Sequence, residues 1–150
     1  MNHPNAVIVR SALIYGKSLN GHSSFTETML KDIRNGKSVK VFTDQFRTPV
    51  LVDDLVKALW ELVWHDYKGI LHIGGPHKVS RMDMGKILCE LFDYPAHLLI
   101  PAKSSEGFQK VLRPLDCSLN TQLSRKILRT EFKDCHAGLK IAFLNNFKNS

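Results

Sequence analysis

Short β-branched runs alternate with helix-length amphipathic stretches along this chain, and that alternation restricts its fold more than any other feature. Four apolar runs read as strands, the first and third fully buried: Ala6–Val9, Val39–Phe42, Ile70–Ile73 and Leu98–Ile100. Strands separated by helix-length crossovers are typical of a parallel sheet. The pattern therefore predicts an α/β fold with a few parallel strands.

Local signals place the helices between and after these runs. Ser23 or Ser24 can cap a helix that ends at Asn35-Gly36. Leu55, Leu59, Leu62 and Val63 recur at helical spacing, with Val56 and Trp60 widening the stripe. Ser80 and Asp83 resemble a capping box. Two further helices are predicted over Thr121–Leu128 and Asp134–Phe147.

The composition is that of an ordinary soluble domain. The 150 residues are 43% hydrophobic and 23% charged, enough for one domain with a core. The net charge is +7, but the basic residues are scattered and not interleaved with aromatics, so we expect no nucleic-acid binding. The longest apolar runs are too short to cross a membrane, and no signal-peptide pattern is present. Three widely spaced cysteines predict free thiols in a reducing cytoplasm and no metal site.

Two polar segments about sixty residues apart are the candidates for function. The first is Asp44–Val50, followed at once by Val52–Leu55, and the second is Leu112–Leu119. Each reads as a turn or loop between apolar elements, where a scaffold presents its ligand contacts. Asp44 and the pair Asp53-Asp54 flank a helix start, so capping and dipole compensation explain them better than an acid pair.

The order of several short pieces resembles the substrate-binding half of extended short-chain dehydrogenases, and most closely the dTDP-4-dehydrorhamnose reductases. The pieces that carry the resemblance, besides the two polar segments, are Val9–Gly16, Ser24-Phe25, Gly69–Gly75 and Ser80-Arg81. It covers most of the chain and implies that residues 1–150 form a single partial domain, the C-terminal portion of a Rossmann-type fold. The activity it implies is NAD(P)H-dependent reduction of a keto sugar nucleotide.

Two motifs that this activity requires are missing from the sequence. A Rossmann cofactor site needs a glycine-rich turn that brings the backbone to the pyrophosphate, and neither GxxGxxG nor GxGxxG occurs among the nine glycines. The family's proton donor is the tyrosine of a Tyr-x-x-x-Lys pair, whereas Tyr15, Tyr67 and Tyr94 are each followed four residues later by leucine. We therefore expect that the N-terminal cofactor half is absent, that the chain has no catalytic residue, and that it binds neither NADP nor NAD alone.

The resemblance also nominates ligand contacts. Arg47 and Arg113 occupy positions that serve the substrate diphosphate in related enzymes, and a guanidinium suits phosphate oxygens in bidentate geometry. The alternative is a surface arginine, or one paired with Asp44 or Asp116. Leu13 and Ser24 fall at substrate-side positions, and Ser11 falls near the family's nicotinamide, its alternative role being a strand-end hydroxyl.

Gln45 has two readings, of which the second is favoured: a contact to a nucleotide-sugar ligand, or a residue that shapes its own loop. Weak binding of that ligand is the leading hypothesis for the chain. The runner-up is a non-catalytic interaction module resembling the regulatory β subunit of methionine adenosyltransferase. In the family that the chain resembles, the strand at Ala6–Val9 lies in one sheet with the cofactor-domain strands, so here it would be open on at least one side. We therefore expect self-association, a partner that supplies the missing strands, or a partly unfolded N-terminus.

Overall fold

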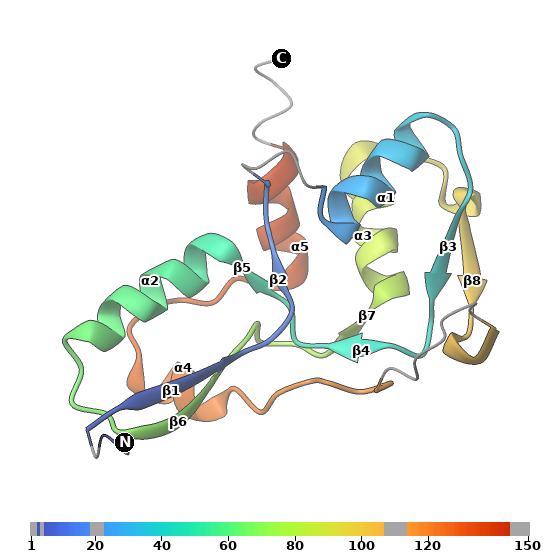
Figure 1. The fold of residues 1–150 in the computed structure, drawn as a ribbon. Helices are drawn as coiled ribbons and strands as arrows, with labels where there is room; N and C mark the ends of the chain where they lie inside the picture. The colour runs from blue at the N-terminus through green and yellow to red at the C-terminus, as the bar shows by residue number, and fades with distance from the viewer. Residues whose placement is uncertain (1–2, 4, 19–22, 107–113, 145–150) are drawn as a thin grey trace.

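The computed structural model describes residues 3, 5–18, 23–106 and 114–144. Within them the strands form four two-stranded ladders, of which three are parallel and the β4–β7 ladder is antiparallel. Figure 1 shows two lobes joined by short central strands. The α/β prediction with short parallel strands is therefore confirmed.

The first lobe is built on β1 (Val7–Ser11), β6 (Gly69–Ile73) and α2 (Val52–Val63). β1 and β6 pair in parallel, with Val7 opposite Gly69 and Ser11 opposite Ile73. Its core contains side chains from α2, β6 and the segment after the short helix α4 (Gln122–Ile127). The buried members are Val50, Leu55, Ala58, Leu62, Leu71, Ile73 and Leu128.

The second lobe packs helices against a parallel pair of strands. α1 (Phe25–Arg34) and α3 (Arg81–Phe92) lie beside β3 (Val39–Phe42) and β8 (Leu99–Ala102). α5 (Cys135–Leu139) continues into a π-helical turn, Lys140–Leu144, and contributes Leu139 and Phe143 to the same core. Short 3-10 turns at Ala96–Leu98 and Ser104–Glu106 flank β8.

Short strands connect the lobes. β2 (Ile14–Tyr15) pairs in parallel with β5 (Val50–Leu51), and β4 (Phe46–Arg47) pairs antiparallel with β7 (Val79–Ser80). The sequence suggested a plain loop over Asp44–Val50, so these two-residue strands are a correction. They arise from long-range pairing, which local propensity does not encode.

The helix starts were predicted well. α1 begins after Ser24 and α3 after Ser80, and each serine forms a reciprocal capping box with the third helical residue. The C-terminal helix predicted over Asp134–Phe147 is shorter and changes to π geometry at Lys140, while Phe147 lies outside the described residues.

The apolar stripe predicted on α2 is only partly a core face. Leu55 and Leu62 are buried, but Leu59, Val63, Val56 and Trp60 are exposed. Helical spacing identifies an apolar face without saying which neighbour covers it. The sequence pattern therefore placed in one stripe both the buried face of α2 and a second apolar face that is exposed.

Candidate functional site

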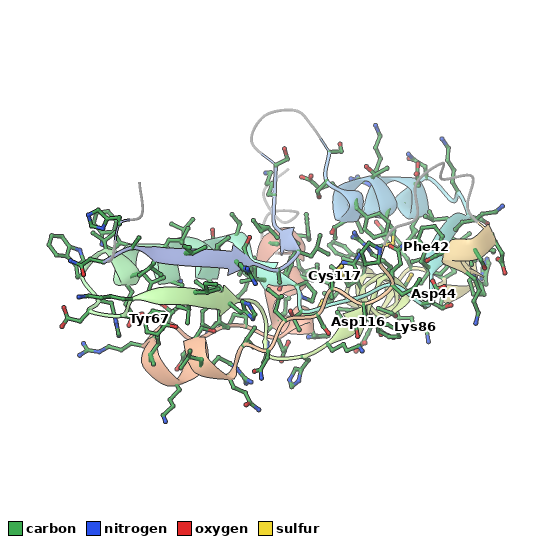
Figure 2. The ribbon with its side chains drawn as sticks, turned by 60° about the horizontal axis from the view of Figure 1, so that its bottom comes forward. Phe42, Asp44, Tyr67, Lys86, Asp116 and Cys117 are labelled. Carbon is green, nitrogen blue, oxygen red and sulfur yellow. The ribbon has the colours of Figure 1, made fainter. Side chains whose placement is uncertain are left out.

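The two polar segments, far apart in sequence, lie side by side. The Phe46 N–H donates to the Leu115 carbonyl at 2.7 Å, and the Cys117 N–H donates to the Phe46 carbonyl at 3.1 Å. Phe46 also forms a parallel bridge with Asp116. Figure 2 shows Asp116 and Cys117 in the middle of the molecule. The prediction that both segments contribute to one region therefore agrees with the geometry.

Arg47 is held at this junction by backbone oxygens. Its Nη1 donates to the carbonyls of Phe46 at 2.5 Å and Leu115 at 3.1 Å, and its Nη2 donates to the Pro114 carbonyl at 3.3 Å. A guanidinium has five N–H donors, so three engaged donors fix its plane, and the other two have no partner in the part of the chain that the structure describes. Neither Asp44 nor Asp116 pairs with it among the described contacts. Arg113, the second proposed phosphate contact, lies outside the described residues.

A second cation stands beside Arg47's strand. Lys78 Nζ is 2.5 Å from Asp116 Oδ2 and 4.6 Å from the centre of the Phe46 ring. Hydrogen bonds from Lys78 and from the side chain and backbone of Ser118 hold the pKa of Asp116 well below its usual range. Asp116 therefore stays ionised and fixes the lysine. Nothing in the sequence around Lys78 marked it, because its partners are 32 and 38 residues away.

Gln45 and Asp44 connect the first polar segment to the turn at Ser104–Glu106. Gln45 is 5% exposed, and its Nε2 lies 3.3 Å from Ser104 Oγ. Asp44 accepts hydrogen bonds from the Ser104 N–H at 3.0 Å and the Ser104 hydroxyl at 2.8 Å. Burial opposes ionisation of Asp44, but these bonds prevail and lower its pKa. The prediction that Asp44 compensates the helix start near Val52 is wrong, because Asp44 caps the turn at Ser104–Glu106 instead.

Asp54 and its neighbour Asp53 do lie in the first turn of α2, as predicted. Asp54 is 2% exposed and accepts a hydrogen bond at 2.8 Å from the Lys133 N–H, 79 residues away. A buried carboxylate in the first helical turn faces the positive end of the helix dipole. It therefore anchors the segment before α5 against α2.

Ser24 borders a small hollow of about 240 Å³ that Tyr15, Gly16, Lys17 and Val52 also line. Its hydroxyl oxygen accepts the Glu27 N–H at 3.3 Å as the cap of α1. Leu13 instead packs against the core of the second lobe. The substrate-side roles of Leu13 and Ser24 therefore stay predictions.

Tyr15 reaches past this hollow into the core. It is 2% exposed, and its hydroxyl has no hydrogen-bond partner among the described residues. Burial, followed by the charges of Cys135, Asp54 and Asp134, raises its pKa far above the usual value. A buried phenol with so high a pKa stays neutral, so Tyr15 contributes packing at this position.

Ser11 ends β1, directly opposite Ile73, and it is exposed. Its strand end lies at the carboxyl edge of the β1–β6 pair, where α/β proteins place their ligands. Within the described chain, no group of three or more His, Cys, Asp or Glu side chains is placed to hold a metal ion. None of the described helices has both the length and the apolar character needed to cross a membrane.

Gly74 and Gly75 lie against the backbone of Thr48 and Pro49 in the first polar segment. The Gly75 N–H donates to the Thr48 carbonyl at 3.1 Å, and the Thr48 hydroxyl accepts from the Leu119 N–H at 3.1 Å. A Cβ on Gly74 would lie 2.9 Å from the Thr48 carbonyl oxygen, and one on Gly75 would overlap the Pro49 carbonyl. The Gly-Gly pair that closes the third predicted strand was visible in sequence, but its role of admitting the Thr48-Pro49 backbone was not.

This arrangement defines a class: α/β proteins in which loops meet at the carboxyl ends of parallel strands, the edge at which such folds usually bind their ligands. The chain belongs to the RmlD substrate binding domain family, whose model matches residues 1–148.

Individual relatives agree with this assignment. The chain is 29% identical over 140 residues to a dTDP-4-dehydrorhamnose reductase of Mycolicibacterium smegmatis, covering 93% of this chain and 42% of that protein. It is 26% identical over 149 residues to a probable low-salt glycan biosynthesis reductase of Haloferax volcanii, covering 94% of this chain and 49% of that protein. The chain thus spans about half the length of the curated relatives it matches.

Solved structures show the same fold. A dTDP-4-dehydrorhamnose reductase from Bacillus anthracis, solved in complex with NADP, matches with a TM-score of 0.80 and 21% identity over 93% of this chain and 48% of that one. A hypothetical dTDP-4-dehydrorhamnose reductase from Sulfolobus tokodaii gives a TM-score of 0.76 and 27% identity, covering 91% of this chain and 47% of that one. The fold of this chain therefore corresponds to about half of a reductase fold.

Proposed function

We propose that this chain is the substrate-binding part of an NAD(P)-dependent sugar-nucleotide reductase and that it contacts the substrate diphosphate through Arg47. The observation that carries the proposal is the fixed guanidinium: three carbonyls orient it, and its two other donors have no partner among the described residues. Arg113 directly precedes Pro114, whose carbonyl Arg47 contacts, so the sequence brings a second cation to the same loop.

Affinity for the diphosphate should be weak. Each charge-assisted hydrogen bond contributes about 1.5–3 kcal/mol. Two such bonds without an enclosing pocket correspond to binding on the order of millimolar. Titration with dTDP, followed by amide shifts in NMR spectra, measures this directly.

The matched variants are Arg47→Gln, which removes the proposed contact, and Arg125→Gln, which removes an exposed charge on α4. We expect the dTDP-induced shifts around Phe46 to disappear only in the first. Shifts that persist in Arg47→Gln, or no shifts at all in the unchanged chain, would show that the site is wrong.

We further propose that these 150 residues do not reduce the sugar alone. The sequence holds neither the glycine-rich turn nor the Tyr-x-x-x-Lys pair, so it supplies no site for the hydride carrier and no proton donor. When bound by a complementary cofactor half, NADPH would supply the hydride. The chain mixed with NADPH and the keto sugar nucleotide should show no oxidation above a heat-inactivated control, and turnover that grows with chain concentration would refute this.

The sheet of the first lobe supports a complementary half. Among the described strands β1 pairs only with β6, leaving its other edge without a ladder. Val7 and Val9 contribute to the core beneath α2, so by alternation Ile8 faces the opposite side, where it is 56% exposed. Open edges and exposed apolar side chains recruit further chain. We propose that strands of a complementary cofactor half, or of another copy, extend the sheet at β1.

Hydrogen exchange and sedimentation velocity test that extension together. We expect β1 amides to exchange quickly in the isolated chain and to become protected when a cofactor half is added or when the chain self-associates. A monomer at high concentration with full protection across Val7–Val9 would contradict it.

The second candidate function is an interaction module of the methionine adenosyltransferase β-subunit kind. It is supported by Leu13, whose partly buried side chain packs against the core of the second lobe. Stable complex formation with a protein partner, unaffected by Arg47→Gln and without dTDP-induced shifts, would select this alternative.

A further inference from the structure

A second hollow lies at the opposite end of the strands from Arg47. It holds about 640 Å³ and is lined by Glu61, Trp64, His65, Ile127, Arg129 and Thr130. The first three come from the end of α2 and the turn that leads into β6, Ile127 ends α4, and Arg129 and Thr130 follow it. The volume is in the range of small-molecule sites. The hollow lies at the amino ends of β1 and β6, away from the junction of the two polar segments at Arg47.

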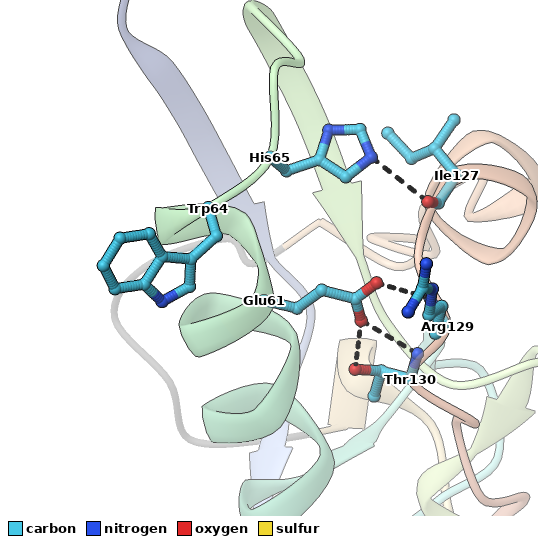
Figure 3. Close-up of a pocket in the computed structure, with 6 residues that line it drawn as sticks. All are labelled: Glu61, Trp64, His65, Ile127, Arg129 and Thr130. Atoms are coloured by element: carbon cyan, nitrogen blue, oxygen red, sulfur yellow. Dashed lines mark hydrogen bonds between the residues drawn. The ribbon is translucent and has the colours of Figure 1, made fainter.

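The Glu61 carboxylate in this hollow already accepts hydrogen bonds from the protein. The carboxylate of Glu61 accepts the Arg129 N–H at 2.7 Å, the Thr130 N–H at 3.0 Å and the Thr130 hydroxyl at 2.9 Å. Burial alone would raise the pKa of Glu61, but these bonds outweigh it and lower the pKa. Figure 3 shows this cluster bridging α2 to the segment after α4.

His65 is likewise engaged through both ring nitrogens. Its Nδ1 accepts the Tyr67 N–H at 3.0 Å, which leaves the proton on Nε2 to donate to the Ile127 carbonyl at 3.3 Å. The wall between α2 and Ile127 is therefore fixed without a ligand. A molecule entering the hollow finds no free imidazole nitrogen.

The groups that a ligand in this hollow could contact are the N–H donors of Arg129 and the indole of Trp64. Among the described residues the Arg129 guanidinium has no hydrogen bond or salt bridge, although its charge helps to lower the pKa of Glu61. The Trp64 indole is 80% exposed. Figure 3 shows the indole and the guanidinium on opposite sides of Glu61. A ligand that uses both must therefore carry an anionic group and a flat ring joined by a spacer. Aromatic stacking and a charge-assisted hydrogen bond would then act at separate ends.

The surrounding charge also favours an anion. The last turn of α4 adds Arg125 and Lys126, both exposed, whereas Glu131 is paired with Lys133 at 3.2 Å. The charge of Glu61 opposes an anion, but it is distributed over three hydrogen bonds to the protein. Between Gln122 and Leu144 five Lys or Arg residues stand against two Asp or Glu, so the segment that supplies Arg129 carries a net positive charge.

We propose that this hollow binds a small anion attached to a planar ring, of the nucleoside monophosphate type, with the ring on Trp64 and the phosphate on Arg129. The site is independent of the diphosphate contact proposed for Arg47, because it lies at the other end of β1 and β6 and uses different residues.

The chain has two tryptophans, Trp60 and Trp64, which permits a direct test. In Trp60→Phe the only indole is at the hollow, whereas Trp64→Phe keeps an exposed indole on the same helix as a control. We expect AMP to quench the first variant saturably and the second not at all. Adenosine and inorganic phosphate, each lacking one half of the ligand, should bind at least about tenfold more weakly, and added salt should weaken AMP binding.

Substitutions then locate the phosphate. Arg129→Gln in the Trp60→Phe background should weaken AMP binding by about tenfold or more, since it removes a charged donor. Lys57→Gln, an exposed charge on α2 outside the hollow, and Arg47→Gln should leave it unchanged. Absence of saturable quenching up to about ten millimolar AMP, equal binding of adenosine, or loss of binding in Arg47→Gln would each overturn the site.

Discussion

Gly138 in α5 offers a test in which two physical effects have opposite signs. Alanine is preferred over glycine in a helix interior by about 1 kcal/mol, so propensity alone predicts that Gly138→Ala stabilises the chain. The structure predicts the reverse. A Cβ at this position would overlap the hydroxyl of the buried Tyr15 and lie 2.8 Å from its Cζ. Overpacking a core costs about 1–3 kcal/mol.

We therefore expect Gly138→Ala to lower the free energy of unfolding by up to about 2 kcal/mol after the propensity gain of about 1 kcal/mol is subtracted from the overpacking cost. Urea unfolding followed by circular dichroism measures it. Ala137→Gly, one residue earlier, reports the local propensity difference and should cost about 1 kcal/mol.

Tyr15→Phe identifies the hydroxyl as the cause. That hydroxyl has no partner among the described residues, so its removal should leave stability unchanged or raise it. Combined with Gly138→Ala it should recover part of the loss, because the Cζ clash stays, giving a coupling of about 0.5–3 kcal/mol. A stabilised Gly138→Ala variant, with no coupling to Tyr15→Phe, would refute the steric argument.

Three other perturbations have defined outcomes. Ser80→Ala removes the cap that accepts the Asp83 N–H at 3.0 Å and should lower unfolding free energy by about 1–2 kcal/mol in urea titration. The folded-state pKa of Glu61 lies below its ordinary value of 4.5. The contribution of Glu61 to the free energy of unfolding is therefore complete above pH 4.5 and disappears as pH falls through the folded pKa. Glu61→Gln should make the free energy of unfolding less dependent on pH in this acidic range. Iodoacetamide at mildly alkaline pH should label Cys117 in the native chain but not the buried Cys89 or Cys135. Burial raises the pKa of both of these thiols, that of Cys135 to about 12. Mass spectrometry after labelling in urea should find all three cysteines modified.

Local chemistry made much of the fold predictable. The serine caps of α1 and α3 depend on residues three positions apart, and β3 has the bounds that its β-branched run indicated. The site was predictable as a pairing of segments but not as a set of contacts. The oxygens that hold Arg47 at Leu115 and Pro114 lie 68 and 67 residues further along the chain, and no local pattern encodes them.

The sequence also could not predict which apolar side chains of α2 are exposed. Val56 and Trp60 share helical spacing with Leu55 and Leu62, yet only the leucines are covered. Periodicity reports that a face is apolar, whereas burial depends on which neighbour is present. The same reasoning applies to the first strand, whose predicted need for further strands stays a prediction.

Phe46 shows how the candidate site depends on both lobes. It pairs antiparallel with Ser80, the cap of α3, and in parallel with Asp116. Its carbonyl also receives the Arg47 Nη1–H and the Cys117 N–H. Because one residue joins the α3 cap, the second polar segment and the guanidinium, a movement of either lobe would change where Arg47 points. The orientation of the proposed phosphate contact is therefore set by long-range pairing that only the folded chain provides.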